Sequence, residues 1–361
     1  MDDSQEALAR KRLAGAGWQV LRSVGRGASG IVFFALRDGE LLAVKAFRDE
    51  ERFLAQACDE VSTLRKVQEL DCEHLQRLED VFGHETQIFV ATAPLTCPLS
   101  ILLPLVQEPA APAFLPAAGL QRLGRQQLGA LQTLHASGLV HGDVKPSNLL
   151  WDGAHARVVL IDFGMSFHEA SGPHQMAQSS GYRAPEAIDW NRSFSSAAGR
   201  ACGGGMDVWG LACVLLELAS GKPLCPADES VSSSQEYHAV VCQELERQLA
   251  SCSLFPRGTM TLIEMDALRE SFCDAMRLLL TKRCSAREAL QHLFFSEAPE
   301  QGLSSVISWP LPTRMLLLEG VLCGDESDED RQTTLQDTKE ECAAFVTVSH
   351  PEHHAREADN G

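Results

Sequence analysis

The sequence is short of basic residues. Its 361 residues carry 31 Lys and Arg against 49 Asp and Glu, a formal net charge of −18 at pH 7. A general nucleic-acid-binding protein needs a basic face that displaces counterions, and a polybasic membrane anchor needs a cluster of cations. We therefore expect neither nucleic acid nor a membrane as a partner. Much of the acidic excess is local, because residues 324–361 hold 11 acidic and three basic side chains.

Long apolar runs and paired cysteines are also missing. No uninterrupted apolar run approaches the roughly 18 residues that a membrane helix needs, and the acidic first residues lack an apolar secretory core. The 12 cysteines form no Cys-x-x-Cys pair and no Cys/His set of the zinc type. This pattern favours reduced thiols over a disulfide framework. We expect a protein of the cytoplasm, the nucleus or both.

Length and local pattern predict two lobes, with an extension before them and a tail after them. At 361 residues and 45% hydrophobic composition the chain can bury more than one core. Residues 1–16 read as an extension that is a polar helix or a frayed segment. The short β-like runs and the one long helix, 51–70, indicate an N-lobe at about 17–93, and helical patterns indicate a C-lobe at about 94–297. Residues 298–361 should be an acidic, disordered tail.

Two segments outside these patterns carry further expectations. The Gly/Ser/Ala-rich stretch 193–205 predicts a flexible loop. Within the tail, the segment 306–323 is apolar enough to dock. This segment, or the acidic tail as a whole, is a candidate docking site for a partner.

A glycine-rich segment lies between two β-like runs. Gly25, Gly27 and Gly30 have the spacing Gly-x-Gly-x-x-Gly, and glycines let a backbone approach phosphates closely. Val32 follows at a position that would cover an adenine. Because the chain continues as a strand and not as a helix, a Rossmann site is not indicated. The motif alone is weak, since a glycine-rich hairpin has the same pattern.

Lys45 lies in the apolar strand 41–47, where its ammonium group needs a partner. It could instead extend from an edge strand into water. Glu60 is the predicted partner, because Val61 and Leu64 place it at the border of the buried face of the following helix. Such a pair would position a lysine that binds phosphate. The rival partners are Glu50, Glu51 and Glu69.

The stretch 141–148, His-Gly-Asp-Val-Lys-Pro-Ser-Asn, carries groups suited to phosphate and metal. Asp143 can accept or orient a hydroxyl proton, Lys145 can neutralise charge on a transferred phosphoryl group, and Asn148 can supply an oxygen to Mg²⁺. Asp162 begins Asp-Phe-Gly directly after an apolar strand, which also suits a metal site. Either segment alone could be a turn with capping residues. The two segments together, in this order along the chain, favour phosphoryl transfer.

These motifs resemble those of the eukaryotic protein kinases across about residues 17–297. The resemblance implies an α+β, two-lobed protein-kinase-like fold, with a small antiparallel β-sheet and one main helix in the N-lobe and a larger, mostly helical C-lobe. It also implies transfer of the γ-phosphoryl group of ATP, with Mg²⁺, to a Ser or Thr of a protein substrate. The other matching segments are Ala43-Val44-Lys45, Ala184-Pro185-Glu186, Asp207-Val208-Trp209-Gly210, and Arg283 before Phe294-Phe295.

The resemblance also assigns roles to single residues. Asp143 is the expected catalytic base, Lys145 acts on the γ-phosphate, and Asn148 and Asp162 bind Mg²⁺. Lys145 and Ser179 favour serine/threonine over tyrosine transfer. The expected nucleotide-binding residues are Val24, Gly25, Gly27, Gly30, Val32, Ala43 and Lys45, with Glu60 as the partner of Lys45. Further expectations are an ion pair of Glu186 with Arg283, a brace at Asp207 and a small gatekeeper residue near Ala91.

Gly142 departs from the family pattern, in which an Arg pairs with a phosphorylated activation segment. Losing this Arg removes a switch but no catalytic group, so we predict activity that does not need activation-segment phosphorylation. His-Gly-Asp also occurs in aminoglycoside and choline kinase-like phosphotransferases, which typically lack Lys145-Pro146 and Ala184-Pro185-Glu186. A nucleotide-binding pseudokinase scaffold remains the main alternative, and a small-molecule phosphotransferase is a weaker one.

Overall fold

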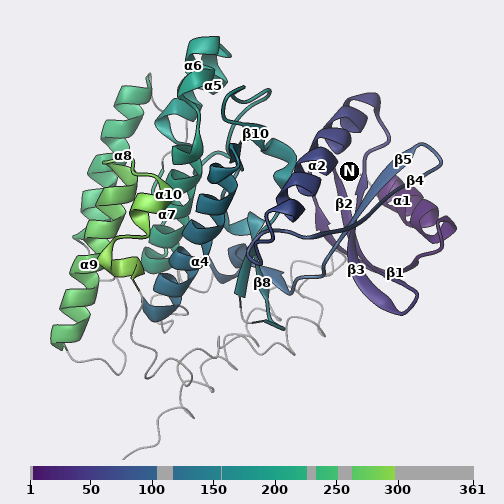
Figure 1. The fold of residues 1–361 in the computed structure, drawn as a ribbon, viewed down its shortest axis with the longest axis horizontal. Coiled ribbons are helices and arrows are strands. Elements are labelled where there is room, and N and C mark those ends of the chain that lie inside the picture. The colour runs from purple at the N-terminus through teal and green to yellow at the C-terminus, as the bar shows by residue number, and fades with distance from the viewer. Residues whose placement is uncertain (1–2, 104–116, 156, 226–232, 251–261, 297–361) are drawn as a thin grey trace, which may run out of the picture.

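The computed structural model describes residues 3–103, 117–155, 157–225, 233–250 and 262–296 (Figure 1). The predicted tail 298–361, with its segment 306–323, lies outside this described part of the chain. Among the described residues, no helix combines the length and the apolar character that crossing a bilayer requires.

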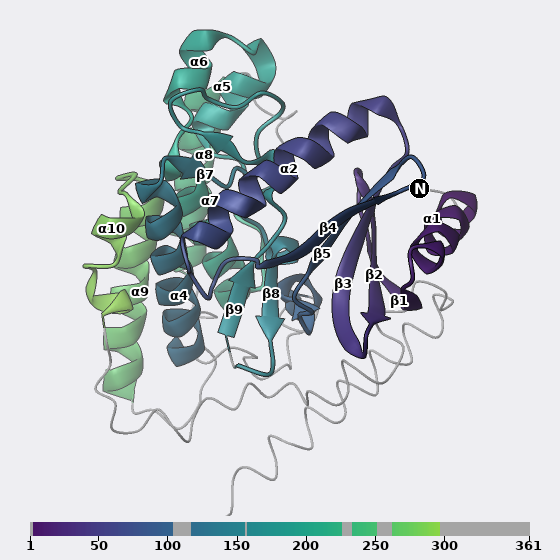
Figure 2. The same cartoon turned by 45° about the vertical axis from the view of Figure 1, so that its right-hand side comes forward.

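The first part of the chain forms a five-stranded antiparallel sheet that carries two helices (Figure 2). Its strand order is β1-β2-β3-β5-β4. Helix α2 (Glu51–Glu69) contacts β3, β4 and β5, whereas helix α1 (Asp3–Gly15) contacts β1 and β4. The strands are β1 (Gln19–Arg26), β2 (Gly30–Arg37), β3 (Glu40–Phe47), β4 (Leu78–His84) and β5 (Gln87–Thr92).

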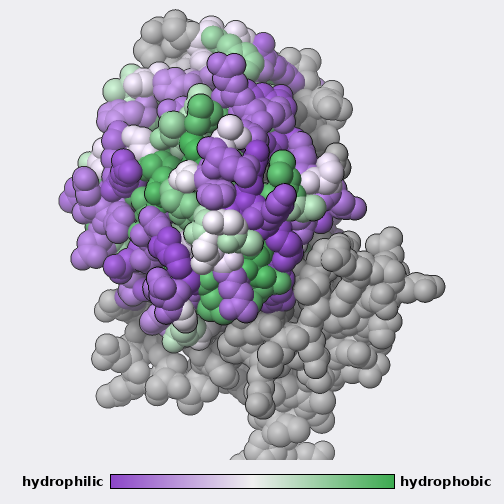
Figure 3. Space-filling model, turned by 90° about the vertical axis from the view of Figure 1, so that its right-hand side faces the viewer, coloured by the Kyte–Doolittle hydropathy of each residue, from purple (hydrophilic) through white to green (hydrophobic). Residues whose placement is uncertain are grey.

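The two faces of this sheet serve different purposes. Because side chains alternate along a strand, one set from β2 and β3 packs with Leu13 of α1 in a small separate core. Val32, Ala43 and Lys45 lie on the other face. Seen from the α1 side, the surface of this lobe is mostly hydrophilic with smaller hydrophobic patches (Figure 3). The sheet residues buried on the α1 side include Ile31, Phe33, Val44, Ala46 and Phe89.

Helix α2 forms where the sequence predicts the long N-lobe helix. The expected bounds were 51–70 and the observed bounds are Glu51–Glu69. The buried residues recur at helical spacing, which turns one stripe of the helix toward the core. Glu60 stands within this stripe and therefore needs a partner from the protein interior. The stripe comprises Ala57, Glu60, Val61, Leu64 and Val67.

The second part of the chain is mainly helical and surrounds α7 (Gly204–Ser220), in which every residue from Met206 to Ala219 is buried. Helices α4 (Ala117–Ala136) and α9 (Leu262–Leu280) pack against α7. The other helices are α5 (Pro185–Ser193), α6 (Ser196–Ala201), α8 (Ser234–Leu249) and α10 (Ala286–Ala289). Short 3-10 helices cover Leu99–Leu102, Pro146–Asn148, Phe163–Met165 and Leu293–Phe295. The short strands are β6 (Cys97–Pro98), β7 (Leu139–Val140), β8 (Leu149–Asp152), β9 (Arg157–Leu160) and β10 (Phe167–His168).

This arrangement agrees with the expected two-lobed α+β fold, with one difference inside a segment predicted to be a flexible loop. Residues 193–205 contain helix α6, so the prediction is wrong there. The side chain of Ser195 accepts a hydrogen bond from the backbone N–H of Ala198 and caps the new helix. The Gly and Ser content suggested a loop, but the same Ser supplies the start signal of a helix.

Candidate active site

Lys45 and Glu60 form the expected pair between β3 and α2. The Lys45 Nζ lies 2.9 Å from Oε1 and 2.8 Å from Oε2 of Glu60. Burial lowers the pKa of Lys45, but the carboxylates of Glu60 and Asp162 outweigh this effect and raise its pKa overall. Burial raises the pKa of Glu60, and Lys45 only partly offsets this. The ammonium group therefore stays charged and is held at a fixed place on the inner face of the sheet.

Asp162 follows β9 and extends this charged group. Its Oδ1 lies 3.5 Å from Lys45 Nζ, and its backbone N–H donates to Oε1 of Gln76 at 3.0 Å. Its φ of 67° is left-handed, a conformation that is uncommon for a residue with a side chain. Burial raises the pKa of Asp162, but Lys45 acting together with His141, Lys145 and the hydrogen bond from the Gly164 backbone outweighs burial and lowers the pKa overall. The carboxylate is thus ionised at neutral pH and 44% exposed.

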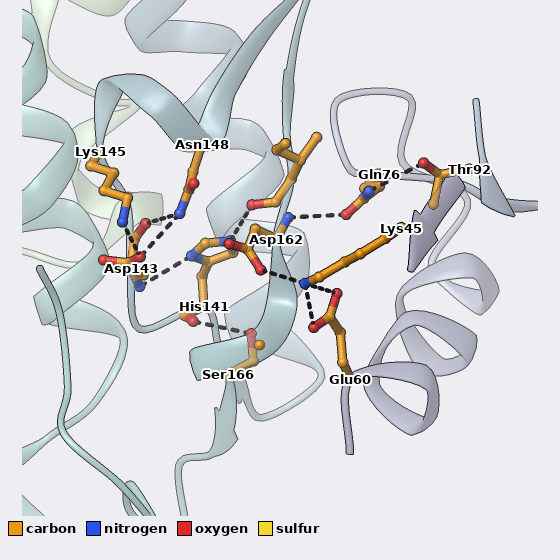
Figure 4. Close-up of polar contacts among 12 residues, drawn as sticks. Lys45, Glu60, Gln76, Thr92, His141, Asp143, Lys145, Asn148, Asp162 and Ser166 are labelled. Carbon is orange, nitrogen blue, oxygen red and sulfur yellow. Dashed lines mark hydrogen bonds and ion pairs between the residues drawn. The ribbon is translucent and has the colours of Figure 1, made fainter. Parts of the chain in front are cut away.

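Asp143, Lys145 and Asn148 form a second group in the loop between β7 and β8. Lys145 Nζ lies 2.7 Å from Asp143 Oδ2, and Asn148 Nδ2 donates to the same oxygen at 3.1 Å. The backbone N–H of Ser179 donates to Asp143 Oδ1 at 2.9 Å, and Lys145 donates to the Ser179 hydroxyl at 2.7 Å. Figure 4 shows Asp162 between this group and the Lys45–Glu60 pair.

The oxygen atoms of Asn148 and Asp162 fit a magnesium ion. Asn148 uses its amide N–H₂ toward Asp143, and its Oδ1 is the atom that would serve as an oxygen ligand. Asp162 offers an ionised carboxylate, and oxygen atoms of this kind are the ligands that Mg²⁺ prefers. The backbone N–H of Ile161 donates to the carbonyl oxygen of Asn148 at 2.9 Å, which keeps the two predicted ligands close.

Asp207 of α7 holds the loop that carries Asp143. This fully buried carboxylate accepts hydrogen bonds from the backbone N–H groups of His141 and Gly142, both at 2.8 Å. His135 Nε2 lies 2.8 Å from its Oδ2. Burial raises the pKa of Asp207, but the hydrogen bond from His135 and the other donors outweigh burial and lower it overall. The expected brace is present.

Gln178 is a buried residue of the activation segment, the stretch from Asp162 to Glu186, and sequence reasoning missed it. Its φ is 58°, and its backbone N–H donates to the carbonyl oxygen of Gly142 at 2.9 Å. Its side-chain amide donates to the carbonyl oxygen of Met206 at 2.9 Å and accepts from the N–H of Ala184 at 2.7 Å. Neutral hydrogen bonds thus tie the segment to both the catalytic loop and α7.

The far end of the activation segment is anchored by charge. Arg283 forms the expected ion pair with Glu186, and its guanidinium carbon lies 5.0 Å from the ring centroid of Trp209. A cation over an aromatic face adds attraction to the ion pair. The segment is therefore held against the helical lobe at Gln178 and again at Glu186.

The glycine-rich segment forms the hairpin between β1 and β2. Gly27 donates its N–H to the carbonyl oxygen of Gly30 at 2.9 Å, and Gly25 pairs with Val32 across the two strands. A Cβ atom at Gly30 would come within 2.3 Å of the carbonyl oxygen of Ala46, so only glycine fits there. Val24 lies in β1, two residues before the end of the strand.

The sequence predicts a small gatekeeper residue near Ala91, and the neighbouring Thr92 is the one of these two residues that lies on the Lys45 side of the sheet. Ala91 is buried in the core on the α1 side, so its side chain points away from Lys45. Thr92 donates to the carbonyl oxygen of Ala43 and accepts from the side chain of Gln76, each at 3.4 Å. A shift of one residue along a strand exchanges the two faces, so the role predicted near Ala91 would belong to Thr92 and not to Ala91.

The comparisons with known proteins agree with this geometry. Residues 18–295 match the family model described as "Protein kinase domain". The chain belongs to the protein kinase family. By sequence, this kinase groups with serine/threonine kinases. It is 32% identical over 233 residues to serine/threonine-protein kinase Kist of Homo sapiens, which covers 63% of this chain and 53% of that protein.

Two further likenesses extend over more of this kinase. Cyclin-dependent kinase 20 of Rattus norvegicus is 32% identical over 319 residues, which are 82% of this chain and 87% of that protein. A crystal structure of a kinase domain superposes with a TM-score of 0.58 at 20% identity and covers 77% of this chain and 95% of its own. This last match shows the fold, and confirms the two-lobed architecture. The chain spans about half the length of the Kist proteins that it matches.

Proposed function

We propose that this chain is an ATP-dependent serine/threonine protein kinase that transfers the γ-phosphoryl group to a Ser or Thr hydroxyl of a protein. The observation that carries the proposal is the simultaneous assembly of both charged groups. Lys45 is paired with Glu60, and Asp143 lies within hydrogen-bond distance of Lys145 and Asn148. A pseudokinase or a small-molecule phosphotransferase would not need the whole set together with a fixed activation segment.

The roles follow from these positions. Asp143 would accept the proton of the substrate hydroxyl while the hydroxyl oxygen forms the new bond to phosphorus and ADP leaves. Lys145 would neutralise charge on the transferred group, and Lys45 would hold the other phosphates. Asn148 and Asp162 would hold Mg²⁺, which supplies further neutralisation of phosphate charge.

The first test is transfer of labelled γ-phosphate to the chain itself and to a general Ser/Thr substrate. Asp143→Asn should lower the rate by roughly 10²- to 10⁴-fold, because it removes the general base. Binding of ATP should change little, since Asp143 does not contact Lys45. Equal rates in the natural chain and the variant would favour the scaffold function instead.

We also propose that activity does not require phosphorylation of the activation segment. Gly142 has no side chain that could bind a phosphate, and the segment beside it is held by the neutral hydrogen bonds of Gln178. Phosphatase-treated protein should start at the same rate as untreated protein, within about twofold, and without a lag. The Ser180→Ala variant should also start at this rate and without a lag, because Ser180 is exposed and, among the described residues, makes no contact that the site needs. The proposal would be wrong if phosphatase treatment abolished activity and the Ser180→Asp substitution restored it.

We also propose that this chain works in the cytoplasm, the nucleus or both, and that residues 306–323 or the acidic tail as a whole dock a partner. Of the nine cysteines in the described residues, none is in a disulfide and six are buried, and this supports a reducing compartment such as the cytoplasm or nucleus.

A further inference from the structure

The first helix, α1, is attached to the sheet at its carboxyl end by a specific turn. Trp18 donates its N–H to the carbonyl oxygen of Leu13 at 3.2 Å, and Gly17 donates to that of Ala14 at 3.0 Å. Gly17 has a φ of 89°. These are the two hydrogen bonds and the left-handed glycine of the Schellman motif, which also brings the side chains of Leu13 and Trp18 together. The extension is thus a docked helix and not a frayed segment.

The buried side of α1 covers one face of the sheet. Ala9 and Leu13 are at most 1% exposed and share a core with Trp18 and Phe33. Trp18 stacks on Phe82 of β4, with 5.5 Å between ring centroids. Figures 1 and 2 both show α1 alongside the sheet, on the side away from the helical lobe. The helix therefore belongs to the folded lobe.

The first turns of α1 reach the glycine-rich segment. Arg26, between Gly25 and Gly27, forms an ion pair with Glu6. Its Nη1 also lies 3.5 Å from Oδ1 of Asp3. The Glu6 side chain is 13% exposed, whereas that of Asp3 is 98% exposed. Glu6 is the contact that matters, since exposed pairs contribute little.

The same helix contacts the segment that leads into α2. Arg12 Nη1 lies 2.8 Å from Oδ2 of Asp49, and its Nε lies 2.7 Å from Oε2 of Glu85. Thr86 donates to Asp49 Oδ2 at 2.6 Å. Asp49 precedes α2, the helix of Glu60, by two residues. One helix thus connects the glycine-rich segment with the start of α2.

We propose that α1 positions the glycine-rich segment over the nucleotide through the Glu6–Arg26 ion pair. This rests on the proposed nucleotide site. Glycines leave a segment with many conformations, and fixing one of them in advance reduces the ordering cost of binding. Glu6 and Arg26 act as positioning residues, because neither contacts the predicted catalytic groups. Loss of the pair should weaken ATP binding and leave the chemical step nearly unchanged.

The test compares Glu6→Gln, Arg26→Glu and the charge swap Glu6→Arg/Arg26→Glu in the full chain, all in an Arg10→Gln background, because Arg10 Nη2 lies 3.6 Å from Glu6 Oε1 and would repel an arginine at position 6. The control is Lys11→Gln, at an exposed position of the same helix. The first readout needs no ligand: hydrogen exchange of the Gly27 amide should quicken in both single variants and recover in the swap. The Trp18 amide reports whether α1 stays docked and should not change.

The second readout is the dissociation constant of Mg²⁺–ATP by calorimetry, with the Michaelis constant and turnover in the kinase assay. Each single variant should raise the dissociation constant by roughly two- to fivefold, with turnover within about twofold and recovery in the swap. Exchange and affinity that match those of Lys11→Gln would overturn the proposal. Because exchange and binding do not depend on transfer, an inactive natural chain would disprove only the kinase function.

Discussion

The two halves of the site are held by different means. In the N-lobe, Lys45 of β3 is held by the carboxylate of Glu60 of α2, and the Lys45 side chain is 17% exposed. In the C-lobe, the Asp143 loop rests on Asp207, which is fully buried in the central helix α7. A single ion pair can break while the lobe stays folded, but Asp207 cannot move without disturbing the core. We infer that the catalytic loop is permanently arranged and that the nucleotide side is adjustable.

The largest effect should come from Asp207→Asn, which breaks the C-lobe half of this comparison. The carboxylate accepts hydrogen bonds from three groups, those of His135, His141 and Gly142. In the variant, the N–H₂ of the asparagine would face at least one of these N–H donors, and two donors cannot form a hydrogen bond with each other. We expect the free energy of unfolding to fall by about 3–5 kcal/mol, with loss of activity, measured by urea unfolding. Asp274→Asn is the control, because Asp274 is 61% exposed and its partner Arg277 is 40% exposed, and it should cost about 1 kcal/mol or less.

The pH dependence of the Asp207 variant gives a second check. The pKa of Asp207 is lowered in the folded protein, so its contribution to stability is present above the unfolded value of about 3.9 and is lost as pH falls through the folded pKa. The stability gap between natural chain and Asp207→Asn should therefore be full at pH 7 and narrow below about pH 4. A gap that stayed constant down to acid-induced unfolding would argue against an ionised Asp207.

Lys45→Met removes the ion pair of the N-lobe. Its effect on the transfer rate should be distinguishable from its effect on the free energy of unfolding, because only the second depends on the ionisation of Glu60. Transfer should fall by roughly 10²- to 10³-fold, because a charge that holds phosphate is lost. Glu60 would remain buried without its partner, so its pKa, already raised by burial, would rise further. The folded state would then lose stability as pH rises through that value, by about 3 kcal/mol at pH 8 and much less at pH 5.

The double variant Lys45→Met/Glu60→Gln tests the cause of that loss. It should recover most of the stability at pH 8 without recovering activity, since the unpaired charge is gone while the phosphate-binding group is still missing. Thermal unfolding at the two pH values is sufficient. If the double variant were as unstable as the single one, the pair would matter through packing and not through charge.

Sequence reasoning recovered the parts of this comparison that depend on residue type and spacing. Lys45 in an apolar strand and Glu60 on a helical stripe predicted their own contact, and the motif at 141–148 predicted the second group. It missed Gln178, whose role depends on a left-handed backbone and on partners 6 to 36 residues away. It also left α1 undecided, because only Ala9 and Leu13 of that helix are buried.

Gly142→Ala should have the smallest effect and sharpens the comparison at the catalytic loop itself. Its φ is 78°, and a Cβ atom would come within 2.6 Å of the carbonyl oxygen of Met165. Gly181, with a φ of 86° and nothing within 4 Å of a Cβ atom, is the matched control. Both alanines pay the backbone cost of about 1–2 kcal/mol, so the extra loss in Gly142→Ala measures the close approach. We expect that extra loss to be about 1 kcal/mol in urea unfolding, with slower transfer, because the start of the activation segment must shift. Equal losses at the two positions would mean that Met165 yields freely and that Gly142 is needed only for its backbone conformation.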